Sequence, residues 1–169
     1  MATLLLPVAP LTRAAFAPFG EVIETDGRDH RRINDGFAER YHDLARIDVA
    51  AQGGRPLLNI FRATPWPMPV RVRMVERHPL SSQAFMPLSA APFLVVVAAP
   101  DARPSPADLR AFRTNGRQGV NFARGTWHHP LLALDGVSDF LVIDRGGPGE
   151  DCDETHFPDA EILVDLAPG

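Results

Sequence analysis

Residues 118–131 read QGVNFARGTWHHPL, and this stretch carries the clearest indication of the fold. Gly125 stands three residues before His128, and a second imidazole, that of His129, follows directly. Adjacent side chains of a regular strand point to opposite faces, so only one of the two imidazoles can face the interior of a barrel. Pro130 places the strand at a sheet edge or ends it there. We expect Trp127, on the far side from His128, to pack in the core.

Short strands are indicated along the rest of the chain. The 17 prolines and 13 glycines interrupt it at close intervals, a pattern typical of many short strands. The longest apolar run, PFLVVVAAP at 92–100, has the length of a single strand. The predicted strands are 4–8, 20–24, 40–44, 57–63, 70–76, 82–87, 93–98, 119–123, 125–129, 137–144 and 161–166. The sequence therefore predicts one all-β domain over residues 1–169, a sandwich or barrel.

Two short helices are also expected. Thr12 is a suitable N-cap for a turn ending near Phe16. The stretch SPADLRAFRTNG, residues 105–116, places Ser105 at the N-cap, Pro106 at the first helical position and Asp108 two residues later. Its asparagine–glycine end is a stop signal, so we predict a second helix there.

Composition narrows the class of protein. The net charge is −4, the 17 basic residues are all arginine, and no basic run resembles a nucleic-acid footprint. No apolar run approaches the roughly 20 residues that span a bilayer. The start, MATLLLPVAPLTR, has no basic region ahead of its apolar stretch, so we expect a cytoplasmic protein with no membrane or nucleic-acid partner. Cys152 lies among acids in GEDCDETH, which predicts a raised thiol pKa and argues against a nucleophile.

A second segment, ERHPLSSQAFMPL at 76–88, gathers polar side chains. Glu76 and His78 are two residues apart, so in a strand they share a face. Gln83 follows across a possible turn, and the three groups can converge in a barrel mouth. The alternative is that they are surface residues at a strand end.

Together the two segments resemble the paired motifs of cupin barrels. Glu76, His78 and Gln83 stand where cupins place two histidines and a glutamate, and Ala123, Gly125 and His128 stand where they place proline, glycine and histidine. The resemblance implies a cupin-like double-stranded β-helix, or jelly-roll barrel.

A more specific resemblance covers residues 11–157. The blocks LTRAAFAPFGEVIE, RYHDLA, IFRATP, VERHPLSSQAFMPL, PFLVVVAAP, LRAFRTNGRQGVNFARGTWHHPLLAL and DFLVIDRGGPGEDCDETHF, in this order, resemble the ureidoglycolate lyase family. This resemblance implies a cupin-like homodimer that splits ureidoglycolate into glyoxylate and urea during allantoin degradation.

The implied substrate is a hemiaminal, whose cleavage needs a base, an acid and a cation. Histidine suits the base, and we expect His128 first and His78 second, with Glu76 as a further candidate if burial raises its pKa. An amide or hydroxyl can form hydrogen bonds with urea, and arginine binds a carboxylate through two parallel hydrogen bonds. The expected binding residues are Gln83, Ser82, Arg124 and Arg62, with Arg77 also near the site; each arginine can equally be a surface residue.

A metal is the open question of cofactor. The family resemblance implies a divalent ion, nickel in particular, and the possible ligands are His78, Glu76, Gln83 and His128. A site that works without metal is equally compatible with these departures from the cupin motif. Two other functions also stay open: a different metal-dependent cupin enzyme, such as an oxygenase or isomerase, and a cupin that binds a ureide or glyoxylate without turnover.

The block RYHDLA gathers Arg40, Tyr41, His42 and Asp43 early in the chain. In a homodimer such a segment can cross to the partner subunit and complete a pocket, although a polar edge strand fits the same residues. Small barrels often cover exposed edges with a copy of themselves, which favours the dimer.

Overall fold

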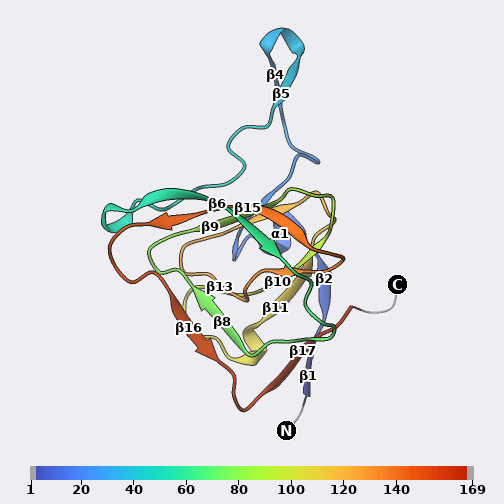
Figure 1. Ribbon diagram of the computed structural model, residues 1–169, viewed down its shortest axis with the longest axis vertical. Helices are drawn as coiled ribbons and strands as arrows, with labels where there is room; N and C mark the ends of the chain where they lie inside the picture. The colour runs from blue at the N-terminus through green and yellow to red at the C-terminus, as the bar shows by residue number, and fades with distance from the viewer. Residues whose placement is uncertain (1–2, 167–169) are drawn as a thin grey trace.

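The computed structural model describes residues 3–166, and most of its regular structure is strand (Figure 1). The strands are β1 (Thr3–Leu6), β2 (Val8–Pro10), β3 (Gly20–Ile23), β4 (Arg31–Ile33), β5 (Ala38–Arg40), β6 (Arg55–Ala63), β7 (Val70–Arg71), β8 (Met74–Arg77), β9 (Gln83–Pro87), β10 (Phe93–Ala98), β11 (Arg110–Arg113), β12 (Gly119–Phe122), β13 (Trp127–His128), β14 (Leu132–Ala133), β15 (Ser138–Gly146), β16 (Asp153–His156) and β17 (Glu161–Val164). The helical elements are α1 (Arg13–Phe16) and the 3₁₀ turns η1 (Asn34–Gly36), η2 (Ala51–Gly53) and η3 (Pro106–Asp108). No helix within residues 3–166 is long and apolar enough to cross a membrane.

Two large sheets face each other across an aromatic core. The five-stranded sheet has the order β3-β12-β9-β15-β6, and the seven-stranded sheet runs β16-β8-β13-β10-β11-β2 with β14 also paired to β10. Phe85, Phe122 and Phe140 of the first sheet pack in one cluster with Phe93 and Phe112 of the second. This double-sheet arrangement confirms the all-β prediction and agrees with a cupin-like jelly roll.

Strand β10 lies between two cores. Phe93, Val95 and Val97 belong to the aromatic core, whereas the alternating Leu94 and Val96 belong to a second core. That second core is closed by the three-stranded sheet β1-β17-β7. A strand that is buried on both faces has apolar residues at successive positions, and this explains the continuous apolar run PFLVVVAAP.

Several predicted strands are shifted or broken. The predicted strand 4–8 is two strands, β1 and β2, which join different sheets on either side of Pro7. The predicted strand 70–76 is interrupted between β7 and β8. The prediction of a strand over 40–44 was wrong, because β5 ends at Arg40. Strands β4, β11, β14 and β16 were not predicted.

One helix prediction is confirmed and the other is wrong. Thr12 caps α1, and its hydroxyl accepts a hydrogen bond from the Ala15 amide at 3.2 Å. The Ser105–Asp108 capping box also forms, but it opens only the single turn η3. The chain then enters β11, where Ala111 and Phe112 are buried in different cores. Tertiary burial on both faces overrides the local helix signal.

A β-bulge follows His128. Val97 pairs with His128, and Leu94 pairs with Leu132. The interval between the two pairs is three residues on β10 but four residues on the opposite strand, so the opposite strand holds one extra residue. The His129 amide donates to the Val96 carbonyl at 2.9 Å inside this gap. The strand is not regular here, yet the two rings still separate: that of His128 stacks on Phe122, whereas that of His129 meets Trp66.

Strands β4 and β5 form a hairpin that stands away from the rest of the molecule (Figure 1). We call residues 28–44 the arm. Its tip is a left-handed turn, with positive φ at Asn34, Asp35 and Gly36. The next side chain, Phe37, is 93% exposed.

Candidate active site

Four side chains from the two predicted segments converge between the large sheets. Glu76 of β8 pairs directly with His128 of β13, so the two side chains share a face. His78 follows β8, and its ring centroid lies 5.2 Å from that of His128. Gln83, the first residue of β9, contacts His78. We call Glu76, His78, Gln83 and His128 the imidazole cluster.

Main-chain carbonyls fix both imidazole rings. His128 Nδ1 lies 2.9 Å from the Thr126 carbonyl oxygen, and His78 Nδ1 lies 2.7 Å from that of Asp151. A carbonyl oxygen only accepts, so each Nδ1 carries a proton and donates it. The hydrogen bonds thus assign the tautomer and direct both Nε2 atoms toward the shared space.

The Nε2 atom of His128 has no hydrogen-bond partner although it is buried. The residue is 2% exposed, and its ring stacks on Phe122 with centroids 4.3 Å apart. Glu76 Oε1 lies 3.6 Å from Nε2, beyond hydrogen-bond distance. With a proton on Nδ1, the ring can present the lone pair of Nε2 beside a carboxylate, which is the arrangement that a general base requires.

His78 has different surroundings. Its Nε2 lies 3.2 Å from Gln83 Oε1, an atom that only accepts. A proton on this nitrogen would be donated to the Gln83 oxygen. The two histidines therefore differ in what lies at Nε2.

The condition on which Glu76 was a candidate base, a raised pKa, is not met. The pKa of its carboxyl is lowered from the ordinary value, chiefly by its interaction with His128, while partial burial acts in the opposite direction. The nearby histidines add a smaller effect in the same sense as His128. Glu76 is consequently a weak base, and it is better suited to stabilise an imidazolium than to remove a proton.

The cluster also fits a divalent cation. Glu76, His78 and His128 each offer one ligand atom, and these three atoms lie within 4.8 Å of one another. Two imidazole nitrogens and a carboxylate oxygen suit nickel or manganese, and the unpartnered Nε2 of His128 is free to coordinate. The Gln83 amide contacts His78 Nε2 at the same point, so it competes with an ion for that nitrogen.

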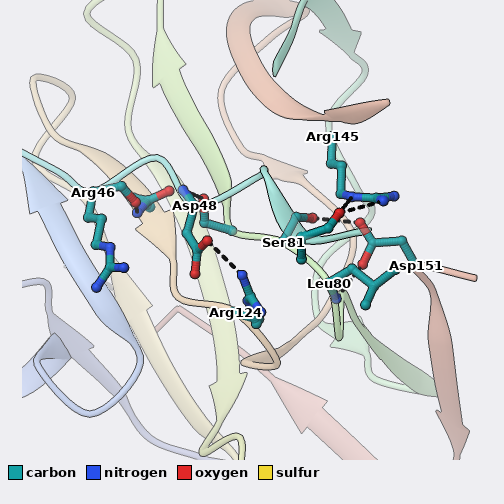
Figure 2. A network of polar contacts seen from close by, with 10 residues as sticks. Arg46, Asp48, Leu80, Ser81, Arg124, Arg145 and Asp151 are labelled. Atoms are coloured by element: carbon teal, nitrogen blue, oxygen red, sulfur yellow. Dashed lines mark hydrogen bonds and ion pairs between the residues drawn. The ribbon is translucent and has the colours of Figure 1, made fainter. Parts of the chain in front are cut away.

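Arg124 belongs to a polar network around Asp48, and Figure 2 shows its guanidinium directed at the Asp48 carboxylate. The Ser82 hydroxyl accepts from the Asp48 amide at 2.8 Å, and the Arg124 guanidinium pairs with the Asp48 carboxylate at 2.7 Å. Ser82 and Arg124 are therefore both bonded to Asp48. The structure does not bring the Ser82 hydroxyl to the imidazole cluster. Arg124 precedes Gly125, whose amide donates to the His78 carbonyl at 2.9 Å.

The other two arginines named from the sequence have partners elsewhere. Arg62 forms two hydrogen bonds to Asp139 across β6 and β15, at 2.8 and 2.9 Å. Arg77 pairs with Asp153 at 2.8 Å and lies over the Trp127 ring at 4.7 Å. Trp127 itself is buried, as expected.

Two acids near the site were missed by the sequence reasoning. Asp151 orients His78 through its carbonyl, while its carboxylate accepts from the Leu80 amide and the Ser81 hydroxyl, both at 2.7 Å (Figure 2). The Asp48 amide donates to the Ser82 hydroxyl, and the Asp48 carboxylate accepts from Arg124. Both acids lie in irregular segments far along the chain from their partners, and no local pattern indicates such contacts.

Two neighbouring groups have perturbed acidity. Burial lowers the pKa of His129, whose ring meets Trp66 edge-on with centroids 5.2 Å apart. The pKa of the Cys152 thiol is raised, first by burial and then by Glu76 and other acids, which confirms the sequence expectation.

A double-sheet β fold with two imidazoles and a carboxylate between the sheets is consistent with a cupin-like protein. The ureidoglycolate lyase family model matches residues 3–165, and the chain belongs to this family.

Curated relatives carry the same name. The ureidoglycolate lyase of Pseudomonas entomophila is 54% identical over 159 residues, covering 94% of this chain and 95% of the relative. That of Burkholderia mallei (strain NCTC 10229) is 56% identical over 162 residues, with 96% and 95% covered. That of Azotobacter vinelandii is 54% identical over 160 residues, with 95% and 96% covered.

Proposed function

We propose that this protein is a ureidoglycolate lyase, which cleaves ureidoglycolate to glyoxylate and urea. Family membership and relatives of that name at more than 50% identity over nearly the whole chain support the proposal. The observation that carries it is the buried, unpartnered Nε2 of His128, which faces a carboxylate and a second imidazole. Allantoin degradation as the pathway and the cytoplasm as the location stay predictions.

The proposed reaction needs one proton removed and one delivered. His128 Nε2 takes the proton of the substrate hydroxyl as the carbonyl of glyoxylate forms and the carbon–nitrogen bond breaks. The bonding electrons pass to the urea nitrogen, which takes a proton from Nε2 of His78. Glu76 stabilises the imidazolium formed at His128, and the Gln83 amide is in position to hydrogen-bond the urea group. No water is consumed, so the reaction is an elimination.

A divalent ion in the cluster would be held by Glu76, His78 and His128. When bound, it would polarise the oxygen atoms of the substrate. We propose measuring metal content of the purified protein together with the thermal midpoint after nickel addition. A site that takes nickel should show a rise in midpoint that His128→Ala abolishes, and an unchanged midpoint would argue against a metal role.

The activity test is direct. Purified protein should release glyoxylate and urea from ureidoglycolate faster than the spontaneous reaction, and His128→Ala should lower kcat by about 10²- to 10⁴-fold, the range for losing a general base. His156→Ala is the matched control, because that imidazole is exposed on β16. Absence of catalysis in the wild type would disprove the proposed function, and near-normal turnover in His128→Ala would disprove the assignment of the base.

A further inference from the structure

A cavity opens beside the imidazole cluster. It lies where the loop before β7, the start of β8 and the residue after β13 meet, and its volume is about 410 Å³, within the range of small-molecule pockets. Met74 lines it, two residues before Glu76 on the same face of β8, and so does His129, the neighbour of His128. None of the four residues of the imidazole cluster lines it. The cavity is therefore a separate space next to the candidate active site.

One wall of this cavity is apolar and contains a fixed aromatic ring. Trp66, Pro67 and Pro69 form the wall, and Trp66 is 41% exposed. The indole nitrogen donates to the Leu131 carbonyl at 3.1 Å, and the ring meets that of His129 edge-on with centroids 5.2 Å apart. These contacts hold the indole in place and leave it an accessible surface for stacking. A flat apolar ring fits such a wall better than a small polar molecule does, because burial of apolar surface is favourable.

Two arginines at the cavity have no acidic partner. Arg71 and Arg73 both line it, and they alternate with the buried Val70 and Val72, so both side chains lie on the exposed side. No carboxylate lines the cavity. Within residues 3–166 the ion-paired arginines are Arg13, Arg62, Arg77 and Arg124. Two unneutralised cations beside an apolar wall favour an anion, because guanidinium binds a carboxylate through paired hydrogen bonds and also stacks on aromatic rings.

His129 supplies a polar atom to the same cavity. The residue is 6% exposed, and its Nδ1 lies 2.8 Å from the Pro130 carbonyl oxygen. This is the only hydrogen bond that the ring makes within the described residues 3–166. Buried polar groups of proteins are normally hydrogen-bonded, so Nε2 is available to a ligand. The cavity thus combines an aromatic wall, two cations and one buried polar contact.

We propose that this cavity binds a flat aromatic carboxylate. The ring of the ligand packs against Trp66, and its carboxylate accepts hydrogen bonds from Arg71 and Arg73. Ureidoglycolate has no apolar ring to bury, so the cavity selects a different class of molecule from the substrate of the proposed lyase. The inference rests on the lining of the cavity and does not depend on the proposed function.

Equilibrium dialysis with 2-naphthoate tests the proposal, and two related compounds separate the contributions of ring and charge. The intact protein should bind 2-naphthoate. The uncharged 2-naphthamide keeps the ring and should bind at least about tenfold more weakly, the scale of a hydrogen bond to a charged group. Acetate keeps the charge without the ring and should show no measurable binding. Absence of 2-naphthoate binding at millimolar concentration, or equal affinities for the acid and the amide, would overturn the proposal.

Variants test the assignment to named residues. Arg71→Ala combined with Arg73→Ala should weaken 2-naphthoate binding by about 10- to 100-fold and change 2-naphthamide binding little. Arg117→Ala is the matched control, because that arginine is exposed and does not line the cavity. Equal losses in the two proteins would refute the assignment. Trp66→Ala should weaken the binding of both compounds, and the arginine variants, which change only exposed positions, test the proposal even if Trp66→Ala does not fold.

His128→Ala shows in which of the two neighbouring sites the aromatic acid lies. That imidazole does not line the cavity, so the variant should keep the wild-type affinity for 2-naphthoate. Loss of binding in His128→Ala, with full binding in the double arginine variant, would assign the acid to the imidazole cluster and overturn the proposal. Absence of lyase activity in the wild type would leave these binding results unaffected, so failure of the proposed function and failure of this inference are distinguishable.

Discussion

At the scale of single residues, His128 and His78 show how the same side chain acquires two roles. Both rings are held at Nδ1 by a main-chain carbonyl, and they differ in what lies at Nε2. Nothing bonds to that atom in His128, whereas the Gln83 oxygen approaches it in His78. The sequence could indicate that these residues converge, but the contacts of Thr126 and Asp151 that set the roles depend on the folded chain.

Glu76→Gln should lower kcat by at least about tenfold with a smaller change in KM. The carboxylate interacts with the imidazolium formed during the reaction, and opposite charges about 4 Å apart near a protein surface attract by several kcal/mol. Steady-state kinetics with ureidoglycolate test this, and Glu76→Asp, which keeps the charge, should recover part of the loss. A change in KM alone would show that Glu76 acts in binding and not on the base.

His129 should make stability depend on pH. Burial lowers its pKa in the folded state, so the unfolded chain binds the proton more readily. The free energy of unfolding should therefore fall as pH drops below about 6.5, the ordinary value of histidine, and reach its plateau above it. His129→Phe, which preserves a ring against Trp66, should flatten this slope in urea unfolding between pH 5 and 7.5. The slope of His156→Gln should match the wild type; an unchanged slope in His129→Phe would contradict the assignment.

At the scale of elements, periodicity predicted strands well where burial is simple. PFLVVVAAP was predicted with the correct bounds because a strand between two cores has no exposed side to interrupt its apolar run. The stretch after Ser105 was mistaken for a helix, since its cap is real but Ala111 and Phe112 alternate between two cores. Short strands such as β4 and β16 bury little and leave no pattern to detect.

Gly20 should be required for the pairing of β3 with β12. A Cβ at this position would overlap the Asn121 carbonyl, and the φ of +146° is one that other residues rarely adopt. We expect Gly20→Ala to lower the free energy of unfolding by about 1–3 kcal/mol, the usual cost of overpacking. Urea denaturation checks this. Gly136→Ala, where an added Cβ meets nothing within 4 Å, should be nearly neutral, and equal effects of the two would contradict this account.

At the scale of the whole molecule, family resemblance and composition pointed to the double-sheet architecture, and the structure has it. The resemblance could not show which arginine serves the substrate, because Arg62 and Arg124 are distant in sequence from the acids that engage them, Asp139 and Asp48. It also could not show that RYHDLA begins at the base of a projecting hairpin.

The position of β10 has a further consequence for motion. Its amides lie under side-chain layers on both sides and between strands at both edges, so deuterons from the solvent can reach them only when the sandwich opens as a whole. In a hydrogen–deuterium exchange experiment the amides of Val95–Val97 should be the last to exchange, at the rate of global unfolding. The amides of the arm, which stands away from both large sheets, should exchange early.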